Sequence, residues 1–218
     1  MQYGPKLVTN GLTLCLDAAD ANSYPGSGTT FTDLTNNGNN ASISGATHSS
    51  TNKGYFDFNG SSNLMTISNS VIPDSTLSYS VLVWCKRDRN SSGYEELLSQ
   101  WTSANSSNSF YFGFNNSNVR FTDDWSNVTV SGAGDTSNWM HLVGVYNTTN
   151  AYIYLNGSLA ATKGSGFSYT GTANLIIGRQ GGLSSEYFDG RIALIQIYNR
   201  ALDPEEIVQN YNVQKSRF

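Results

Sequence analysis

Charged side chains are scarce in this sequence, and long apolar runs are absent. Charged residues make up 13% of the chain and the net charge is −4 at pH 7. No basic stripe is therefore available to neutralise a nucleic-acid backbone. The longest apolar runs, Leu12–Leu16 and Ile192–Ile197, are far shorter than the roughly 20 residues that span a bilayer. We expect no nucleic-acid partner and no membrane insertion.

Cysteine and histidine are also rare, with two residues of each. Cys15 and Cys85 both lie in apolar stretches, LTLCLD and VLVWCK, where a free thiol behaves as a small buried hydrophobe. A disulfide between them requires Cα atoms within about 7 Å, which the sequence does not show, so both states stay open. No Cys or His spacing fits a zinc site, and neither His48 nor His141 lies near a cysteine in the sequence.

The polarity of the chain comes mainly from Asn, Ser, Thr and Gly. There are 21 glycines, and aromatic residues make up 12% of the chain. Asn, Ser and Gly favour turns, while aromatic rings suit a pleated, half-buried surface, so the composition predicts an all-β protein. The first residues, MQYGPKLVTNG, lack the charged start and apolar core of a secretory signal, so we expect no export signal.

Short apolar or alternating runs recur along the chain between turn clusters. They predict strands at 11–17, 55–59, 64–67, 77–85, 95–100, 110–114, 119–122, 139–146, 151–155, 158–161, 174–178 and 191–198. Residues 18–40 are dense in Gly, Asn, Ser and Asp and predict a long ordered surface loop, and His48 is also expected in a polar loop. No repeat or linker divides the chain, so we predict a single domain over residues 1–218.

Two local signals are specific. Asn156-Gly157, between two strand-like runs, predicts a two-residue hairpin turn because this pair tolerates positive φ angles. Asp203-Pro204-Glu205-Glu206 places a capping residue, a proline at the first helical position and a glutamate at the third, so a short helix is predicted over about residues 204–212.

The order of these elements is typical of one family. The runs that carry the resemblance are Ser78–Trp84, Asn138–Tyr146, Tyr152–Gly157, Leu175–Gly178, Phe188–Ile192 and Ile197–Ile207. Together they resemble the concanavalin A-like, laminin-G-like jelly-roll family, which implies a sandwich of two antiparallel sheets with one short C-terminal helix. Such a sandwich would bury Val81, Val83, Leu142, Ile153, Leu155, Ile176 and Ile195, with Trp84 and Trp139 also in the core, and would leave a polar concave face.

The N-terminal part carries a second resemblance. The segments Gly11–Ala18, Ser23–Thr30 and Asp33–Asn40 are similar to single-domain structural proteins of tailed, marine phages. This resemblance implies a virion protein assembled in the host cytoplasm, displayed at the virion surface and in contact with other virion proteins. It also accounts for the missing export signal.

Carboxylates do not form the pattern of a glycan hydrolase. Hydrolytic jelly-roll relatives carry closely spaced acidic residues, typically E-x-D-x-x-E, because retaining cleavage needs carboxyls about 5–5.5 Å apart. The chain has five glutamates: adjacent Glu95 and Glu96 should point to opposite faces of a strand, Glu186 stands alone, and Glu205 and Glu206 lie at the helix start. A hydrolase or lyase is therefore the least favoured function, and we predict no catalytic residues.

Calcium is the one metal to weigh, because relatives hold it with oxygen ligands from loops. Asp33, Asn37 and Asn39 form one candidate site, joined by Asp17 or Asp20, and Asn105 and Asn108 with Glu186 form a second. The alternative is that these Asn-rich loops bond their own backbone without an ion. At Asn59–Asn63, relatives commonly carry Asp, which weakens the case for a metal there.

Sugar recognition needs an aromatic ring for the apolar face of a pyranose and polar groups for its hydroxyls. The predicted ligand-binding residues lie outside the obvious core runs and are Trp101, Asn105, Asn108, Asp123, Trp125, Glu186 and Tyr187. Tyr94, Tyr111 and Asp124 also lie outside these core runs and are further candidates. For any one of these rings the alternative is a half-buried sheet residue. We therefore predict a non-enzymatic carbohydrate-recognition or adhesion module of a virion, in a tail fibre or receptor-binding position. Such a module would be multivalent through homo-oligomerisation. The alternative is a capsid or tail decoration protein with no sugar site.

Overall fold

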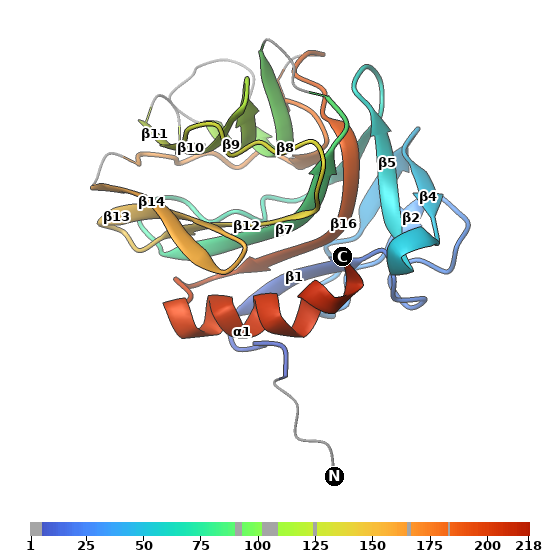
Figure 1. Cartoon of the computed structure of the whole chain (residues 1–218), viewed down its shortest axis with the longest axis horizontal. Coiled ribbons are helices and arrows are strands. Elements are labelled where there is room, and N and C mark those ends of the chain that lie inside the picture. Colours follow the sequence, from blue (N-terminus) through green and yellow to red (C-terminus); the bar gives the residue numbers. More distant parts are fainter. Residues whose placement is uncertain (1–5, 90–92, 102–108, 124–125, 165–166, 183) are drawn as a thin grey trace.

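Two antiparallel β-sheets pack face to face, and one helix, α1 (Pro204–Gln214), lies outside one of them (Figure 1). The structure is a computed structural model. It describes residues 6–89, 93–101, 109–123, 126–164, 167–182 and 184–218, apart from the side chains of residues 52, 123, 126 and 127. The predicted all-β sandwich with one C-terminal helix is confirmed.

Sheet A is the sheet on which α1 packs. Its strands, in spatial order, are β14 (Ser158–Gly164), β13 (Asn150–Leu155), β12 (Met140–Tyr146), β7 (Tyr79–Arg87), β16 (Asp189–Tyr198), β5 (Tyr55–Asn59) and β4 (Thr47–Ser49), with β1 (Leu12–Asp17) also paired to β16. The short 3₁₀ helices η1 (Thr51–Lys53) and η3 (Lys215–Arg217) follow β4 and α1.

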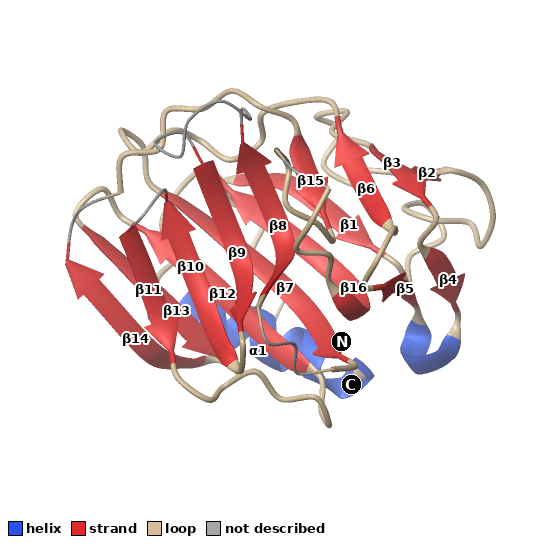
Figure 2. Cartoon of the chain, turned by 90° about the horizontal axis from the view of Figure 1, so that it is seen from above, coloured by secondary structure: helices blue, strands red, loops and turns tan. Residues whose placement is uncertain are grey.

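Sheet B forms the opposite layer. Its strands, in order, are β11 (Ser126–Val130), β10 (Asn118–Asp123), β9 (Ser109–Asn115), β8 (Tyr94–Trp101), β15 (Leu175–Ile177), β6 (Leu64–Ile67), β3 (Ala41–Ser44) and β2 (Thr30–Phe31). Figure 2 views the molecule from this side, with sheet B in front and α1 behind. The outer face of sheet B therefore lies on the side of the molecule away from α1.

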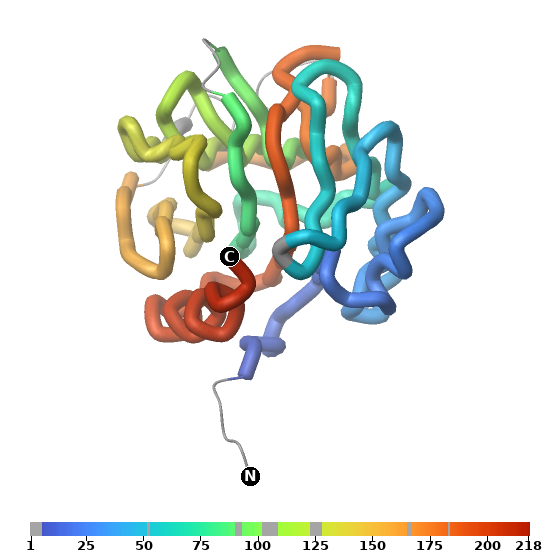
Figure 3. The backbone as a smooth tube through the Cα atoms, turned by 45° about the vertical axis from the view of Figure 1, so that its right-hand side comes forward, coloured from blue at the N-terminus to red at the C-terminus, as the bar shows by residue number. Residues whose placement is uncertain are grey.

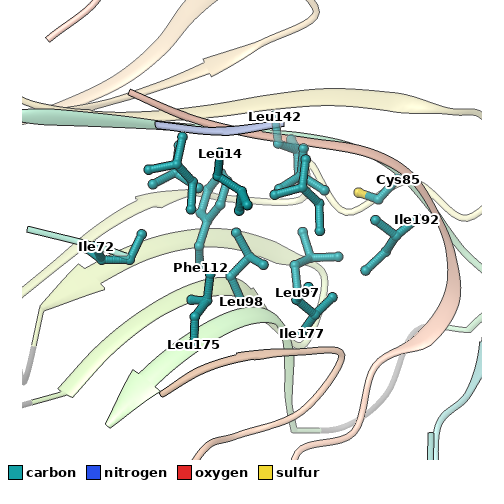
Figure 4. Close-up of a cluster of buried hydrophobic side chains, with 14 of the residues drawn as sticks. Leu14, Ile72, Cys85, Leu97, Leu98, Phe112, Leu142, Leu175, Ile177 and Ile192 are labelled. Atoms are coloured by element: carbon teal, nitrogen blue, oxygen red, sulfur yellow. The ribbon is translucent and has the colours of Figure 1, made fainter. Parts of the chain in front are cut away.

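The main core fills the space between the two sheets. Alternate residues of β7, β8, β12 and β15, among them Leu98, Leu142, Leu175 and Ile177, point into it and are fully buried (Figure 4). Leu155 is only partly buried against this core, and Ile176 points out of it, because its neighbours Leu175 and Ile177 occupy the inward positions of β15. Ile176 is buried, as predicted, but on the outer face of sheet B and not between the sheets.

A second apolar layer lies between sheet A and α1. Ile207 of α1 packs there with Leu82, Trp84 and Leu194, so Trp84 is buried on the outer face of sheet A, not between the sheets. Trp139, expected in the core, is only half-buried at the edge of this layer. Each tryptophan is next to a residue that points into the core between the sheets, so alternation along the chain turns its ring toward the helix side.

Polar side chains of α1 fix the helix on the sheet. Asn210 accepts a hydrogen bond from the Val8 amide at 2.9 Å and donates to the Tyr198 hydroxyl at 3.0 Å. Gln214 accepts from the Trp84 indole N–H at 2.7 Å. Figure 3 shows the first described residues passing beside α1, where these bonds hold them.

The two local signals found in the sequence are confirmed. Asn156 and Gly157 have φ angles of 50° and 82° and join β13 to β14. Glu206 accepts a hydrogen bond from the Asp203 amide at 3.0 Å as the capping box requires, and α1 starts at Pro204. The helix continues to Gln214, two residues beyond the predicted end.

Several elements were not expected. Strands β3, β4 and β11 lie in polar Ser, Asn and Thr-rich segments, and β2 interrupts the predicted 18–40 loop. His48, expected in a loop, lies in β4, with its ring Nε2 2.9 Å from the Ala18 carbonyl oxygen. These segments lie at sheet edges or partly exposed positions, where backbone pairing with a neighbouring strand stabilises a strand that the composition alone does not predict.

The two cysteines are free, and both are buried. Cys85 points into the core between the sheets, whereas Cys15 belongs to the layer between sheet A and α1. Opposite faces of one sheet cannot be bridged by a disulfide, so of the two states left open by the sequence the structure shows the reduced one.

Candidate functional site

The outer face of sheet B carries a group of aromatic and charged side chains. Because side chains alternate along a strand, the burial of Phe110, Phe112 and Phe114 in the core turns Tyr111 outward, and Phe121 does the same for its neighbour Arg120. On β8, Tyr94, Glu96 and Trp101 lie on this outer face as well, with a bulge between Glu96 and Leu98.

The loop 179–187, which follows β15, lies along the same face. The Ser99 hydroxyl donates to the Arg179 carbonyl at 2.8 Å, and the Glu96 amide donates to the Glu186 carbonyl at 3.1 Å. The Gln180 amide donates to the Tyr111 hydroxyl at 3.4 Å. These bonds hold the loop against β8 and β9.

Glycine is required where this loop meets Trp101. A methyl group on Gly182 would collide with the six-membered part of the Trp101 ring, whereas one on Gly181 would meet only ordinary contacts from 3.4 Å outward. The loop backbone therefore packs directly on the tryptophan, which fixes the ring and leaves it half-buried.

Two carboxyl groups meet beneath Arg120. Glu96 is fully buried and forms an ion pair with Arg120, whose Nη2 also lies 3.9 Å from Glu186 Oε2. Burial is the main cause that raises the pKa of Glu96 to about 8; Arg120 opposes this shift and Glu186 adds to it. Within the described residues neither Glu96 Oε2 nor Glu186 Oε2 has a hydrogen-bond donor.

Guanidinium groups pack on the rings of this face. The Arg120 guanidinium lies 4.3 Å from the Tyr94 ring centroid and 4.9 Å from that of Tyr111. Arg179 lies 5.7 Å from the Tyr187 ring, and the Trp101 and Tyr111 rings are 6.1 Å apart. Tyr94 is 45% exposed, so part of this surface is open to solvent. Tyr111 and Arg120 are buried in this surface, whereas Trp101, Tyr187, Arg179 and Glu186 are partly exposed, so a polar ligand with an apolar face can contact these four groups and Tyr94.

The predicted ligand-binding residues are only partly placed by the structure. It brings Trp101, Glu186 and Tyr187 to the outer face of sheet B. Asn105, Asn108 and Trp125 lie outside the described residues, as does the side chain of Asp123, so these predictions stay predictions. Arg120, Arg179 and Gln180 were not predicted, because none of them stands in a motif and only the strand pairing and the loop after β15 bring them to this face. The alternation of Phe110, Phe112 and Phe114 around Tyr111 was the signal that could have located this face.

The loop with the candidate calcium ligands is held by its own hydrogen bonds. The Asp33 carboxylate is buried and accepts bonds from the amides of Cys15 and Thr35, both at 3.0 Å, and from the Thr35 hydroxyl at 2.7 Å. The side-chain nitrogens of Asn37 and Asn39 donate to the Thr13 carbonyl at 3.0 and 3.2 Å.

The remaining carboxylates near these loops also have partners. Asp17 pairs with Arg217 at 2.8 Å, and the Asp20 side chain accepts from the Asn22 amide at 2.8 Å. In the part of the chain that the structure describes, no cluster of three or more His, Cys, Asp or Glu residues could hold a metal ion. The calcium site at Asp33, Asn37 and Asn39 therefore stays a prediction.

Glu95 lies on the other side of its strand from Glu96, as predicted. It forms ion pairs of 2.8 Å with the fully buried Arg87 of sheet A and with Arg89. The Arg87 guanidinium also lies 4.3 Å from the Phe114 ring centroid. Glu95 therefore links the two sheets and contributes nothing to the outer face.

None of the described helices is long and apolar enough to cross a membrane.

Several solved structures are similar to this chain. Domain 4 of AbnA, a GH43 extracellular arabinanase from Geobacillus stearothermophilus, in complex with arabinotriose, matches with a TM-score of 0.72 and 16% identity, covering 92% of this chain and 98% of that one. The binding domain of Paraclostridial Mosquitocidal Protein 1 matches with a TM-score of 0.70 and 14% identity, covering 93% and 52%. A Trypanosoma rangeli sialidase matches with a TM-score of 0.70 and 15% identity, covering 97% and 34%.

These likenesses, at low identity, show a shared fold. The chain spans about half the length of the toxin domain and a third of the sialidase. A comparison with curated protein sequences found no match. The Laminin_G_3 family model, described as the concanavalin A-like lectin/glucanases superfamily, matches residues 59–208, which is more than half of the chain. The chain therefore belongs to the concanavalin A-like lectin/glucanases superfamily.

Proposed function

We propose that this chain is a non-enzymatic carbohydrate-recognition or adhesion module that binds glycans on the outer face of sheet B. One observation carries the proposal: the partly or fully exposed rings of Trp101, Tyr187 and Tyr94 lie with Arg179 and Glu186 on the face opposite α1. An apolar sugar face can stack on such rings while guanidinium and carboxyl groups bond its hydroxyls.

The arrangement of the outer face of sheet B favours a ligand-binding role over a purely structural one. Loop 179–187 is bonded to β8 and β9, so its side chains are positioned before a ligand arrives, which lowers the entropy lost on binding. A domain of similar fold and size, domain 4 of the arabinanase, was solved in complex with arabinotriose, which supports a sugar ligand for this chain too.

The carboxyl groups of this face do not suit hydrolysis. Glu96 is fully buried beneath Arg120 and cannot reach a substrate. Retaining and inverting cleavage both need two carboxyl groups that reach the substrate, and of this pair only Glu186 is partly exposed. These features support the non-enzymatic part of the proposal.

We further propose that the module is displayed on a virion surface, in a tail fibre or receptor-binding assembly. Its support is the resemblance of the segments 11–18, 23–30 and 33–40 to structural proteins of tailed phages. A single shallow site binds weakly, so the proposal includes homo-oligomers that gain avidity from several sites. Gold-labelled antibodies against the protein should decorate purified particles in electron micrographs; unlabelled particles would contradict this placement.

A glycan array with the purified protein tests the binding proposal, run once with calcium and once with a chelator. We expect selective glycan binding that is lost in Trp101→Ala and weakened in Glu186→Ala. The matched control is Leu159→Ala on β14 of sheet A, which removes an exposed side chain far from the site and should bind as the wild type does.

The array also separates the alternatives. Binding only with calcium would mean that an ion organises the site. Binding that Trp101→Ala leaves intact would place the site elsewhere and contradict the proposal. If no glycan binds in either condition, the decoration protein without a sugar site becomes the better explanation.

A further inference from the structure

A hollow lies on the helix side of the molecule, where sheet A meets α1. It has a volume of about 370 Å³ and is lined by residues of β7, of the segment before β12, of the β13–β14 turn, and of α1 and η3. This volume falls in the range of roughly 300–1,000 Å³ that is typical of small-molecule sites. Since α1 packs on the outer face of sheet A, the hollow and the outer face of sheet B lie on opposite sides of the sandwich (Figure 1).

Aromatic rings form the floor of this hollow. The Phe218 ring stacks on Trp84 with centroids 4.3 Å apart and lies 4.7 Å from Trp139, while Tyr211 lies parallel to Trp84 at 5.8 Å. Trp84 is buried and its indole N–H bonds Gln214, so the floor is fixed. Trp139, Tyr211 and Phe218 are half-buried and keep part of each ring open to solvent.

Two lysines line the hollow without a compensating acid. Lys86 extends from β7 and Lys215 from η3, and within the described residues neither forms an ion pair. Arg217, the next cation along, differs because it is paired with Asp17 at 2.8 Å. Of the described residues that line the hollow, none is an aspartate or a glutamate. In a chain of net charge −4, this leaves a local positive site that favours an anion.

The other groups near the hollow are neutral. His141 is buried under the floor, with its ring 5.1 Å from Trp84 and 5.5 Å from Tyr211, and burial lowers its pKa to about 3. Asn156 lies at the rim, where its Oδ1 accepts a bond from the His141 amide at 3.0 Å. Among the side chains of the site, the charge therefore comes from the two lysines, and the amide adds a group that can bond hydroxyls.

We propose that this hollow is a second binding site, specific for a sugar that carries a carboxylate, such as a hexuronate unit of an acidic polysaccharide. The apolar face of the sugar ring packs on the open parts of Trp139 and Phe218, and the carboxylate lies between Lys86 and Lys215. A neutral sugar lacks the group that the lysines would bond. The site uses no residue of the glycan face on sheet B and does not depend on that proposal.

Isothermal titration with a trigalacturonate and with a neutral galactose trisaccharide tests this site. The wild type should bind the acidic trisaccharide, with an affinity that falls as salt is added, and should bind the neutral one at least about tenfold more weakly. In the double variant Lys86→Gln, Lys215→Gln, affinity for the acidic sugar should fall by about tenfold or more. These side chains are exposed or half-exposed, so the variant should fold, and thermal unfolding confirms it.

Two controls assign the binding to this hollow. Lys163→Gln removes a lysine of β14 that does not line the hollow and should bind as the wild type does. Trp101→Ala, which is expected to disable the glycan face of sheet B, should also keep its affinity for trigalacturonate. The proposal is overturned if the acidic sugar does not bind, if the double lysine variant binds it as well as the wild type, or if only Trp101→Ala abolishes binding.

Discussion

Glu96 and Glu186 approach each other from two directions on the outer face of sheet B, one from β8 and one from the loop that follows β15. The amide of Glu96 bonds the carbonyl of Glu186 at 3.1 Å, and Arg120 faces both carboxyl groups. Glu186 adopts a positive φ of 58°, a conformation that costs free energy in a residue other than glycine. The pair therefore connects the loop to the sheet, and the protonation of Glu96 makes this connection depend on pH.

The protonation of Glu96 should make stability depend on pH. Its pKa is about 8 in the folded protein, against 4.5 for a glutamate free in water, so the folded state holds a proton that the unfolded chain releases. The stability that this proton gives is fully present below pH 4.5 and is lost as the pH rises toward 8. Glu96→Gln keeps a neutral side chain that can accept from Arg120 and donate to Glu186. We expect this variant to match the wild type at pH 5 and to melt at a higher temperature than the wild type at pH 9.

Thermal unfolding by circular dichroism at both pH values measures this difference. Glu205→Gln, on the exposed first turn of α1, is the control and should follow the wild type at each pH. Parallel pH dependence in the wild type and in Glu96→Gln would show that the carboxyl pair does not hold a proton.

The contact between Gly182 and Trp101 should control the loop. Gly182→Ala places a methyl group inside the tryptophan ring, so the loop must shift, at a cost of about 1–3 kcal/mol in unfolding free energy. Gly181→Ala is its matched control, since its methyl group meets only ordinary contacts at 3.4 Å or more. The unfolding free energy in urea and the glycan affinity should both fall in the first variant and stay near wild type in the second. Equal values for the two variants would mean that the loop does not pack on Trp101 as described.

The ion pair between the sheets should matter more than those at the surface. Arg87→Ala removes the fully buried partner of Glu95 and leaves it only the exposed Arg89, so the unfolding free energy should fall by about 3 kcal/mol. Arg191→Ala removes a cation that is 29% exposed and pairs with Asp57 and Asp88, and should cost less than about 1 kcal/mol. Urea denaturation compares them, and similar losses would contradict the distinction drawn from burial.

The Asp33 loop offers a test of calcium. Its carboxylate already accepts hydrogen bonds from Cys15, Thr35 and Asn39, so the folded loop needs no ion to neutralise repulsion between ligands. Of the two possibilities that the sequence leaves open, these bonds favour the loop without an ion, so we expect the same Tm in calcium and in chelator, and a lower Tm for Asp33→Ala in both. A Tm that rises by several degrees with calcium in the wild type but not in Asp33→Ala would show that the loop rearranges around an ion.

The sequence predicts local structure best where the backbone geometry strongly favours one residue type. Asn156-Gly157 and Asp203-Pro204 marked a turn and a helix start that the structure confirms. Ile176 and Trp139 were misplaced because hydrophobicity alone does not tell which face of a sandwich a residue occupies. That choice depends on register and on where α1 docks, which are properties of the whole chain.

The site was harder to predict than the fold for a related reason. Trp101 is separated from Glu186 and Tyr187 by more than eighty residues, and they reach the same face only because the loop after β15 returns to β8. Arg120 carried no motif, yet it contacts Glu96, Tyr94 and Tyr111. Its outward position follows from Val119 and Phe121 pointing into the core, a pattern that is informative once the sheet is known.

A crystal structure of the protein soaked with the strongest neutral ligand from the glycan array would locate the sugar site itself. We predict a sugar ring stacked on Trp101 or Tyr187, with hydroxyls bonded to Glu186 or Arg179, on the outer face of sheet B. A neutral glycan bound anywhere else on the molecule, with this face empty, would contradict glycan recognition by sheet B.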